Sequence, residues 1–271
     1  MTSIIGVSGQ AGSGKDTVAN YLVEKYDFVK IALADPIKHF GYHVFGFSQE
    51  QLWGPSESRN CIDERYHTVE SWNLAQFRLE MYGHEYIELV TGEKDTEFVA
   101  GAFKKLVTWF NWLRENYQGK LSPRIMLQTL GTEWGRDAVG PNLWIDCLLR
   151  TTATLLGECD EPAPYAYNPL DGLRKRPLKG FKLPAGVVVS DVRFENEFKQ
   201  IHNAGGAVIR VIRPDTDAAS KILGVVGHAS EAQQFDVSNF DFILQNDKTL
   251  VDLYSNVDTY MLVYNNQHEG T

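Results

Sequence analysis

The chain contains little cysteine, fewer basic than acidic residues and no long apolar run. Its three cysteines, Cys61, Cys147 and Cys159, lie far apart without a C-x-x-C pair, which argues against a disulfide framework or a zinc knuckle. The net charge of −9 disfavours broad binding to nucleic-acid backbones, although it leaves room for a local basic pocket. No run reaches transmembrane length, and the N-terminus lacks the features of a signal peptide. We therefore expect a cytoplasmic protein without a membrane or a nucleic-acid polymer as partner.

The remaining composition is that of an ordinary globular protein. Hydrophobic residues make up 43% and charged residues 23% of the 271 residues, so the chain can bury a core. This length suits one α/β domain with insertions, and we expect residues 1–271 to form a single domain.

Short runs rich in β-branched residues predict five strands, at residues 3–7, 28–33, 186–190, 207–212 and 241–244. Most are followed by helix-like stretches, an alternation typical of a doubly wound, mainly parallel sheet. Ligands of such sheets bind at the carboxyl ends of the strands.

Two intervals interrupt this alternation. Residues 48–157 show helical periodicity at 97–117, 124–139 and 143–156, and we interpret them as a helical insertion that builds an acceptor pocket. Residues 158–185 are rich in proline and include Arg174, Lys175 and Arg176, a composition that predicts a lid or a loop.

A glycine-rich loop joins the first predicted strand to the first predicted helix. Its glycines let successive backbone N–H groups turn inward toward phosphate oxygens, and the helix N-terminus adds its positive dipole end. Lys15 is placed to reach the β- and γ-phosphates of a donor nucleotide. We therefore predict a P-loop NTPase-type three-layer fold, and the alternative is a strand-to-helix turn without a ligand. The predicted ATP-binding residues are Gly12, Ser13, Gly14, Lys15, Asp16 and Thr17.

Asp16 stands where most loops of this type have a serine or threonine that contacts Mg²⁺. A carboxylate oxygen can hold the same hard cation, directly or through a water molecule. Our hypothesis is that Asp16 takes this metal role and that Thr17 supports it.

The sequence resembles the bacteriophage deoxynucleoside monophosphate kinases, P-loop enzymes with an adenylate-kinase-like core. The similarity extends from Gly9 to about Asn246, and the Gly-Lys-Asp-Thr spelling of the loop is part of it. The segments that carry it are residues 12–17, Ala34-Asp35-Pro36-Ile37-Lys38, Leu127-Gln128-Thr129-Leu130-Gly131-Thr132, Trp144, the run from Ser190 to Glu197, and His228-Ala229-Ser230-Glu231.

The resemblance implies transfer of phosphate from ATP, with Mg²⁺, to deoxynucleoside monophosphates of more than one base. It also implies the host cytoplasm as location if the gene belongs to a phage. The acceptor-site residues that it implies are Arg124, Gln128, Gly131, Thr132, Trp144, Asp191, Arg193 and Glu197, with Asp35 and Lys38 at the edge.

The chemistry of two phosphates explains why arginines matter here. The acceptor is already anionic, so catalysis reduces to positioning and charge neutralisation, which bidentate guanidinium groups perform well. We take Lys15, Arg124, Asp191 and Arg193 as the catalytic candidates. Without the resemblance, Arg124 reads as a surface cation.

Three further candidates have alternative readings. Asp191 could contact the metal or the acceptor sugar, or it could cap the following helix. Glu197 could read the acceptor base or be an exposed helix glutamate. Trp144 could crowd C2′ of the acceptor sugar and disfavour ribose, or belong to the core.

Enzymes with other activities use the same kind of glycine-rich phosphate-binding loop. A dephospho-coenzyme A kinase or a nucleoside kinase is the nearest alternative, and an ATPase switch is one from another class. The sequence leaves open whether the chain forms a homodimer, whether Arg174 to Arg176 close over ATP, and what His228 and Glu231 do.

Overall fold

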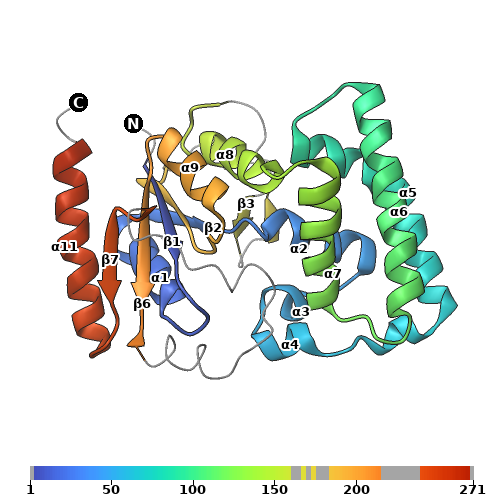
Figure 1. Cartoon of the computed structure of the whole chain (residues 1–271), viewed down its shortest axis with the longest axis horizontal. Coiled ribbons are helices and arrows are strands. Elements are labelled where there is room, and N and C mark those ends of the chain that lie inside the picture. Colours follow the sequence, from blue (N-terminus) through green and yellow to red (C-terminus); the bar gives the residue numbers. More distant parts are fainter. Residues whose placement is uncertain (1–2, 160–165, 169–171, 175–182, 215–238, 269–271) are drawn as a thin grey trace. The chain divides into compact units, whose positions relative to one another are not determined.

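The computed structural model describes residues 3–159, 166–168, 172–174, 183–214 and 239–268 (Figure 1). The chain divides into two compact units. The sheet unit comprises residues 1–33 and 151–271, and the helical unit comprises residues 34–150. The helical unit thus begins earlier than the insertion expected at residues 48–157, directly after the second strand. That the whole chain acts as one kinase domain stays a prediction.

The sheet unit is built on five parallel strands in the order β2-β5-β1-β6-β7. All five predicted strands are confirmed, with boundaries shifted by two residues at most. Ile5 of the central strand pairs with Val188 on one side and Ala207 on the other. The strands are β1 (Ile4–Ser8), β2 (Phe28–Ile31), β5 (Gly186–Val189), β6 (Ala207–Ile212) and β7 (Phe242–Gln245).

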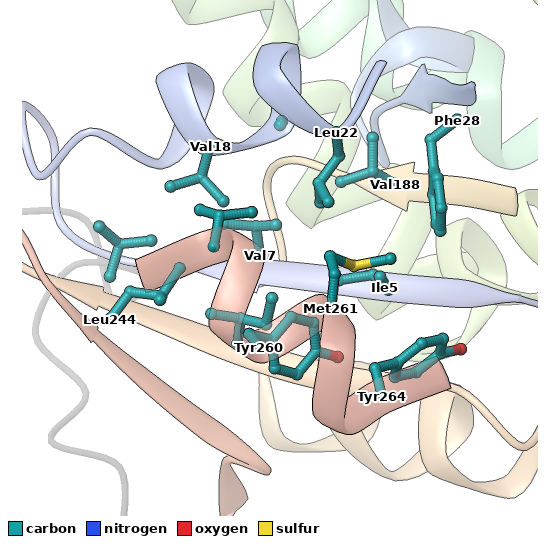
Figure 2. Packing of buried hydrophobic residues seen from close by; sticks show 14 of the residues in the cluster. Ile5, Val7, Val18, Leu22, Phe28, Val188, Leu244, Tyr260, Met261 and Tyr264 are labelled. Atoms are coloured by element: carbon teal, nitrogen blue, oxygen red, sulfur yellow. The ribbon is translucent and has the colours of Figure 1, made fainter. Parts of the chain in front are cut away.

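Helices cover both faces of this sheet, as the predicted three-layer fold requires. On one face, α1 (Lys15–Tyr26) and α11 (Leu250–His268) share a hydrophobic core with the strands, and Figure 2 shows Leu22, Met261 and Ile5 within it. On the other face lies α9 (Glu195–Asn203): a Cβ on Gly6 of β1 would approach Ile201 Cδ1 of this helix to 2.9 Å. The sheet is therefore the middle layer.

A polar cluster joins the two helices that cover the first face. Asp258 of α11 accepts hydrogen bonds from Tyr21 (3.0 Å) and Tyr26 (2.8 Å) and forms an ion pair with Lys25 (2.7 Å). All three partners are on α1. Burial would raise the pKa of Asp258, but these bonds lower it below its ordinary value. The cluster fixes α11 against the helix that follows the glycine-rich loop.

The helical unit contains a pair of long helices, α5 (Val69–Thr91) and α6 (Thr96–Tyr117), which run side by side (Figure 1). The helices predicted at 97–117 and 143–156 are confirmed as α6 and as α8 (Leu143–Leu155). The stretch predicted as one helix at 124–139 changes at Leu130 from α-helix to π-helix. The remaining elements are α2 (Asp35–Phe40), η1 (Gly41–Phe45), α3 (Gln49–Trp53), α4 (Ser56–Asn60), η2 (Glu64–His67), α7 (Pro123–Thr129) and η3 (Leu130–Val139). Helix α8 begins in the helical unit and continues to Leu155, beyond residue 150, where the sheet unit resumes.

Aromatic side chains fill the core of the helical unit. Phe40 of α2 lies 4.8 Å from Tyr86 of α5 and 5.9 Å from Trp109 of α6, measured between ring centroids. All three rings are buried, so they tie the short helices at the start of the unit to the two long ones.

The predicted lid at residues 158–185 contains two short antiparallel strands, β3 (Ala166–Asn168) and β4 (Gly172–Arg174), which composition did not predict. Lys175, Arg176, His228 and Glu231 lie outside the described residues. Among the described residues, no helix combines the length and apolar character needed to cross a membrane.

Candidate active site

The glycine-rich loop follows β1 and is held in a tight conformation. Gly14 begins α1 with φ of 99°, and a Cβ there would lie 2.5 Å from the side-chain nitrogen of Asn246. Asn246, which follows β7, donates a hydrogen bond to the carbonyl oxygen of Ser13 (2.8 Å), and the N–H of Ser13 donates to the carbonyl of Gln10 (3.1 Å). The loop therefore needs glycine at position 14, both for the left-handed backbone and for the close approach of Asn246.

Lys15 is the first residue of α1 and turns back over the loop. Its Nζ donates a hydrogen bond to the carbonyl oxygen of Gln10 at 3.4 Å, and its side chain is half-buried. The ammonium group thus lies at the loop, while Lys15 itself stands at the positive end of the helix dipole. Together they offer the donors that a polyphosphate requires.

Asp16 is exposed on the first turn of α1 and has a basic partner that the sequence did not point out. Lys30 of β2 forms an ion pair with Oδ1 of Asp16 (2.9 Å) and donates a hydrogen bond to Asn20 (3.2 Å), one helical turn further along. The carboxylate is a hard oxygen ligand next to the predicted phosphate site, so its chemistry fits Mg²⁺.

Asp191 and Arg193 follow β5, the strand beside β1, at the carboxyl edge of the sheet. The Oδ1 of Asp191 accepts a hydrogen bond from the N–H of Leu33 (2.7 Å), where the chain leaves β2. The N-cap of α9 is Phe194, so the alternative that Asp191 caps this helix is wrong. The Arg193 side chain is exposed.

Glu197 is 2% exposed, which excludes the exposed helix glutamate considered above. Its Oε2 accepts hydrogen bonds from the N–H groups of Arg193 (2.7 Å) and Phe194 (3.0 Å). The carboxylate thereby satisfies donors at the start of α9 and fixes the backbone that carries Arg193. Contact with the acceptor base stays a prediction.

In the helical unit, Asp35 and Lys38 share one partner, Trp53 of α3. The Lys38 ammonium lies 3.4 Å from Oδ1 of Asp35 and 5.7 Å from the centroid of the Trp53 ring. The indole Nε1 donates to the same carboxylate oxygen at 3.4 Å. Asp35 is buried and Lys38 is half-buried. No sequence motif had indicated Trp53 as a residue of the site. The sequence showed only a tryptophan at the end of a short helix.

The other predicted residues of the helical unit lie on α7 and η3 and at the start of α8. A Cβ on Gly131 of η3 would lie 3.1 Å from Ile37 Cδ1 of α2, so the glycine permits close packing of these two elements. Near the start of α7, Arg124 donates a hydrogen bond from Nε to Oδ1 of Asn60 on α4. Gln128 and Thr132, on α7 and η3, are half-buried.

Trp144 packs within the helical unit. Its side chain is 3% exposed, its Nε1 donates to the carbonyl oxygen of Gly131 (2.8 Å), and its ring lies 6.0 Å from that of Trp134. The bond holds the backbone of a predicted acceptor residue. The idea that Trp144 crowds the acceptor sugar stays a prediction.

The predicted residues thus form two sets. The loop from Gly12 to Thr17 belongs to the sheet unit, together with Asp191, Arg193 and Glu197. The set in the helical unit consists of Asp35, Lys38, Arg124, Gln128, Gly131, Thr132 and Trp144.

Comparison with known proteins gives a consistent result. Residues 3–161 match the family model described as deoxynucleotide monophosphate kinase. The chain is 26% identical over 265 residues to a putative deoxynucleotide monophosphate kinase of Acanthamoeba polyphaga mimivirus, covering 94% of this chain and 93% of the relative. It is 24% identical to the deoxynucleotide monophosphate kinase of Enterobacteria phage T4, covering 96% and 99%. It is 29% identical to the deoxynucleoside-5′-monophosphate kinase of Escherichia phage T5, covering 56% and 64%.

Proposed function

Because the chain belongs to the deoxynucleotide monophosphate kinase family, we propose that it transfers the γ-phosphate of ATP to deoxynucleoside monophosphates and forms the diphosphates and ADP. The observation that carries this proposal is the loop at the end of β1. There, the left-handed backbone at Gly14 leads into the first turn of α1, and the Lys15 ammonium turns back to the Gln10 carbonyl of the same loop. Such a loop at a helix N-terminus is suited to bind phosphate. The assignment of individual residues below is part of the proposal.

The donor is held by the loop from Gly12 to Thr17. Backbone N–H groups bind the phosphate oxygens, and Lys15 exchanges its bond to the Gln10 carbonyl for bonds to the β- and γ-phosphates. This exchange costs little because the carbonyl oxygen is a neutral acceptor and the phosphates are charged. Asp16, supported by Thr17, would hold Mg²⁺, which neutralises charge on the phosphates when bound.

The acceptor roles are assigned residue by residue, as the family resemblance implies. Arg124 and Arg193 bind the acceptor phosphate and the transferring group, and Gln128, Gly131 and Thr132 line the acceptor site. Asp35 and Lys38 form its edge, where the partnered carboxylate and ammonium keep a defined arrangement. Asp191 would contact the metal or the sugar, Glu197 would contact the base, and Trp144 would disfavour ribose.

The proposal extends to the setting of the reaction. Cys61, Cys147 and Cys159 are all free thiols, which suits the reducing cytoplasm, including that of a host cell. We propose no nucleic-acid polymer as a partner, and the activity is compatible with a homodimer.

A coupled assay of ADP formation tests the activity. The protein is given ATP and Mg²⁺ with each of the four deoxynucleoside monophosphates and each ribonucleotide counterpart. We expect ADP only when a monophosphate is present, faster turnover with deoxyribose than with ribose, and a loss of about 10²–10³-fold in Lys15→Met. Release of inorganic phosphate without an acceptor would instead indicate an ATPase switch. Phosphorylation of dephospho-coenzyme A or a nucleoside, and of no monophosphate, would assign another kinase.

A second comparison tests the roles of Asp191. Asp191→Asn keeps an oxygen that can accept the N–H of Leu33, whereas Asp191→Ala removes it. We expect Asp191→Asn to have a lower turnover and an unchanged unfolding temperature. In Asp191→Ala we expect both the turnover and the unfolding temperature to fall. Normal turnover in Asp191→Asn would limit this residue to holding the chain after β2.

A further inference from the structure

We propose that Asn60 is a positioning residue of the acceptor site, which holds the guanidinium of Arg124 so that its two Nη groups face the acceptor phosphate. The inference rests on the proposed role of Arg124. Its basis is the hydrogen bond from Nε of Arg124 to Oδ1 of Asn60, two residues that are 64 positions apart in the sequence. Both belong to the helical unit.

The backbone around this bond shows that the pairing is built into the fold. The N–H of Gly119 donates to the carbonyl oxygen of Tyr66 (3.0 Å), and the N–H of Asp63 donates to that of Leu121 (2.8 Å). Along one segment the residue numbers fall from 66 through 63 to 60, while along the other they rise from 119 through 121 to 124. Asn60 and Arg124 are therefore the third contact between two antiparallel segments, and two backbone bonds set their register.

Side chains of α4 also fix the helix end that carries Asn60. Arg59 donates one hydrogen bond to the carbonyl of Gly54 (2.6 Å) and one to Ser56 Oγ (3.2 Å), and Ser58 donates to Glu50 of α3 (3.2 Å). A five-residue helix has little stability of its own, so these bonds keep it in place. The side-chain amide oxygen of Asn60 thus meets Arg124 from a supported position.

The chemistry of the two side chains explains why an asparagine is suitable. A guanidinium has five N–H donors in one plane, so engaging Nε leaves the two Nη groups for end-on bidentate contact with a phosphate. The amide orients the guanidinium and reduces the side-chain entropy lost on binding, while leaving its positive charge whole. A carboxylate at position 60 would accept the same bond but would cancel the charge and repel the acceptor.

The test replaces Asn60 in the full chain with leucine, which lacks an acceptor, and with aspartate. We expect Asn60→Leu to weaken binding of the acceptor and its kcat/KM by about three- to tenfold, the range of one hydrogen bond, with the KM for ATP unchanged. Asn60→Asp should lose at least as much. Calorimetry of dTMP binding without ATP gives a readout besides turnover. Asn116→Leu is the matched control, since this exposed asparagine of α6 donates, among the described residues, only to the carbonyl of Trp112 in its own helix.

A double-mutant cycle with Arg124→Met separates the possible results. If Asn60 acts through Arg124, Asn60→Leu has no further effect in the Arg124→Met background. If Arg124→Met alone keeps normal turnover, the proposed role of Arg124 is wrong and the inference falls with it. If Arg124→Met is impaired while Asn60→Leu behaves like Asn116→Leu, or adds fully to Arg124→Met, only the inference is overturned. Should Asn60→Leu not fold, Asn60→Ser replaces it, because its hydroxyl is too short to reach Nε.

Discussion

Replacement of Glu197 by alanine should destabilise the protein much more than a typical change in a helix. The side chain is 2% exposed, and one carboxylate oxygen accepts bonds from the N–H groups of Arg193 and Phe194 at 2.7 and 3.0 Å. Alanine leaves both backbone donors without this partner at the point where the chain turns into α9.

The size of the effect follows from those two bonds. A hydrogen bond to a charged group contributes about 1.5–3 kcal/mol, whereas loss of a helix cap costs about 0.5–2 kcal/mol because water replaces part of what is lost. The Arg193 side chain is exposed, so water can reach part of this region. We therefore expect Glu197→Ala to lower the free energy of unfolding by about 2–4 kcal/mol, or the Tm by roughly 5–15 °C. Glu197→Gln keeps an accepting oxygen without the charge and should lose about half as much.

Urea unfolding followed by circular dichroism measures the effect. The control is Glu195→Ala, which removes an exposed carboxylate from the same turn and breaks its surface ion pair with Lys199 (2.7 Å), at a cost below about 1 kcal/mol. An equal urea midpoint for Glu197→Ala and Glu195→Ala would refute the capping argument. Glu197→Gln could also keep its stability but lose turnover with deoxynucleoside monophosphates of one base. Direct contact between Glu197 and that base would then be the better explanation.

Three other perturbations have defined outcomes. Burial would raise the pKa of Asp63, but bonds from Arg65 and Gln51 lower it below the ordinary 3.8. The Asp63 carboxylate therefore stabilises the folded protein fully above about pH 4, and this stabilisation is lost as the pH falls through the lower pKa of the folded state. The difference in Tm between wild type and Asp63→Asn should shrink in acid, and a constant difference would contradict this. Burial raises the pKa of the Cys147 thiol to about 12, so a thiol reagent at about pH 8 should label the two exposed cysteines and reach Cys147 only after unfolding; three fast thiols in the native protein would be evidence against this. Finally, Lys30→Met removes the positive partner of Asp16 and should raise the KM for ATP about two- to fivefold relative to the control Lys199→Met, whereas equal KM values would show that the pair has no such role.

Local patterns predicted the elements that depend on neighbouring residues. The strand Gly186–Val189 is a continuous apolar run that is buried on both faces, and the glycine-rich loop is spelled in one contiguous segment. Both were therefore recognised without knowledge of the rest of the chain. Helix α5 was not predicted, because exposed apolar residues such as Phe77 and Met81 blur the contrast between its two faces.

The contacts that orient the site could not be predicted, since they join residues far apart in sequence. Asn60 meets Arg124 only because backbone bonds elsewhere set the register of their segments. Trp53 meets Asp35 only because α3 packs against the start of the helical unit. A residue type and its immediate neighbours carry no information on such a partner. The bonds from the N–H groups of Arg193 and Phe194 to Glu197 are local, but phenylalanine at the N-cap gives no capping signature in the sequence, so the sequence did not indicate them either.

Asp191 is part of both a local pattern and a distant contact. It directly follows the apolar strand β5, and its carboxylate accepts a hydrogen bond from the N–H of Leu33, the last residue before the helical unit begins. The residue thus fixes the end of β2 to the end of β5, and both strands end at the edge of the sheet where ligands of this fold bind. We propose that the same side chain also contacts the metal or the acceptor, so that one carboxylate serves both the backbone after β2 and a ligand. An aspartate suits this double task because its two oxygens can serve different partners at once, which a serine or an asparagine does less well because neither carries the negative charge.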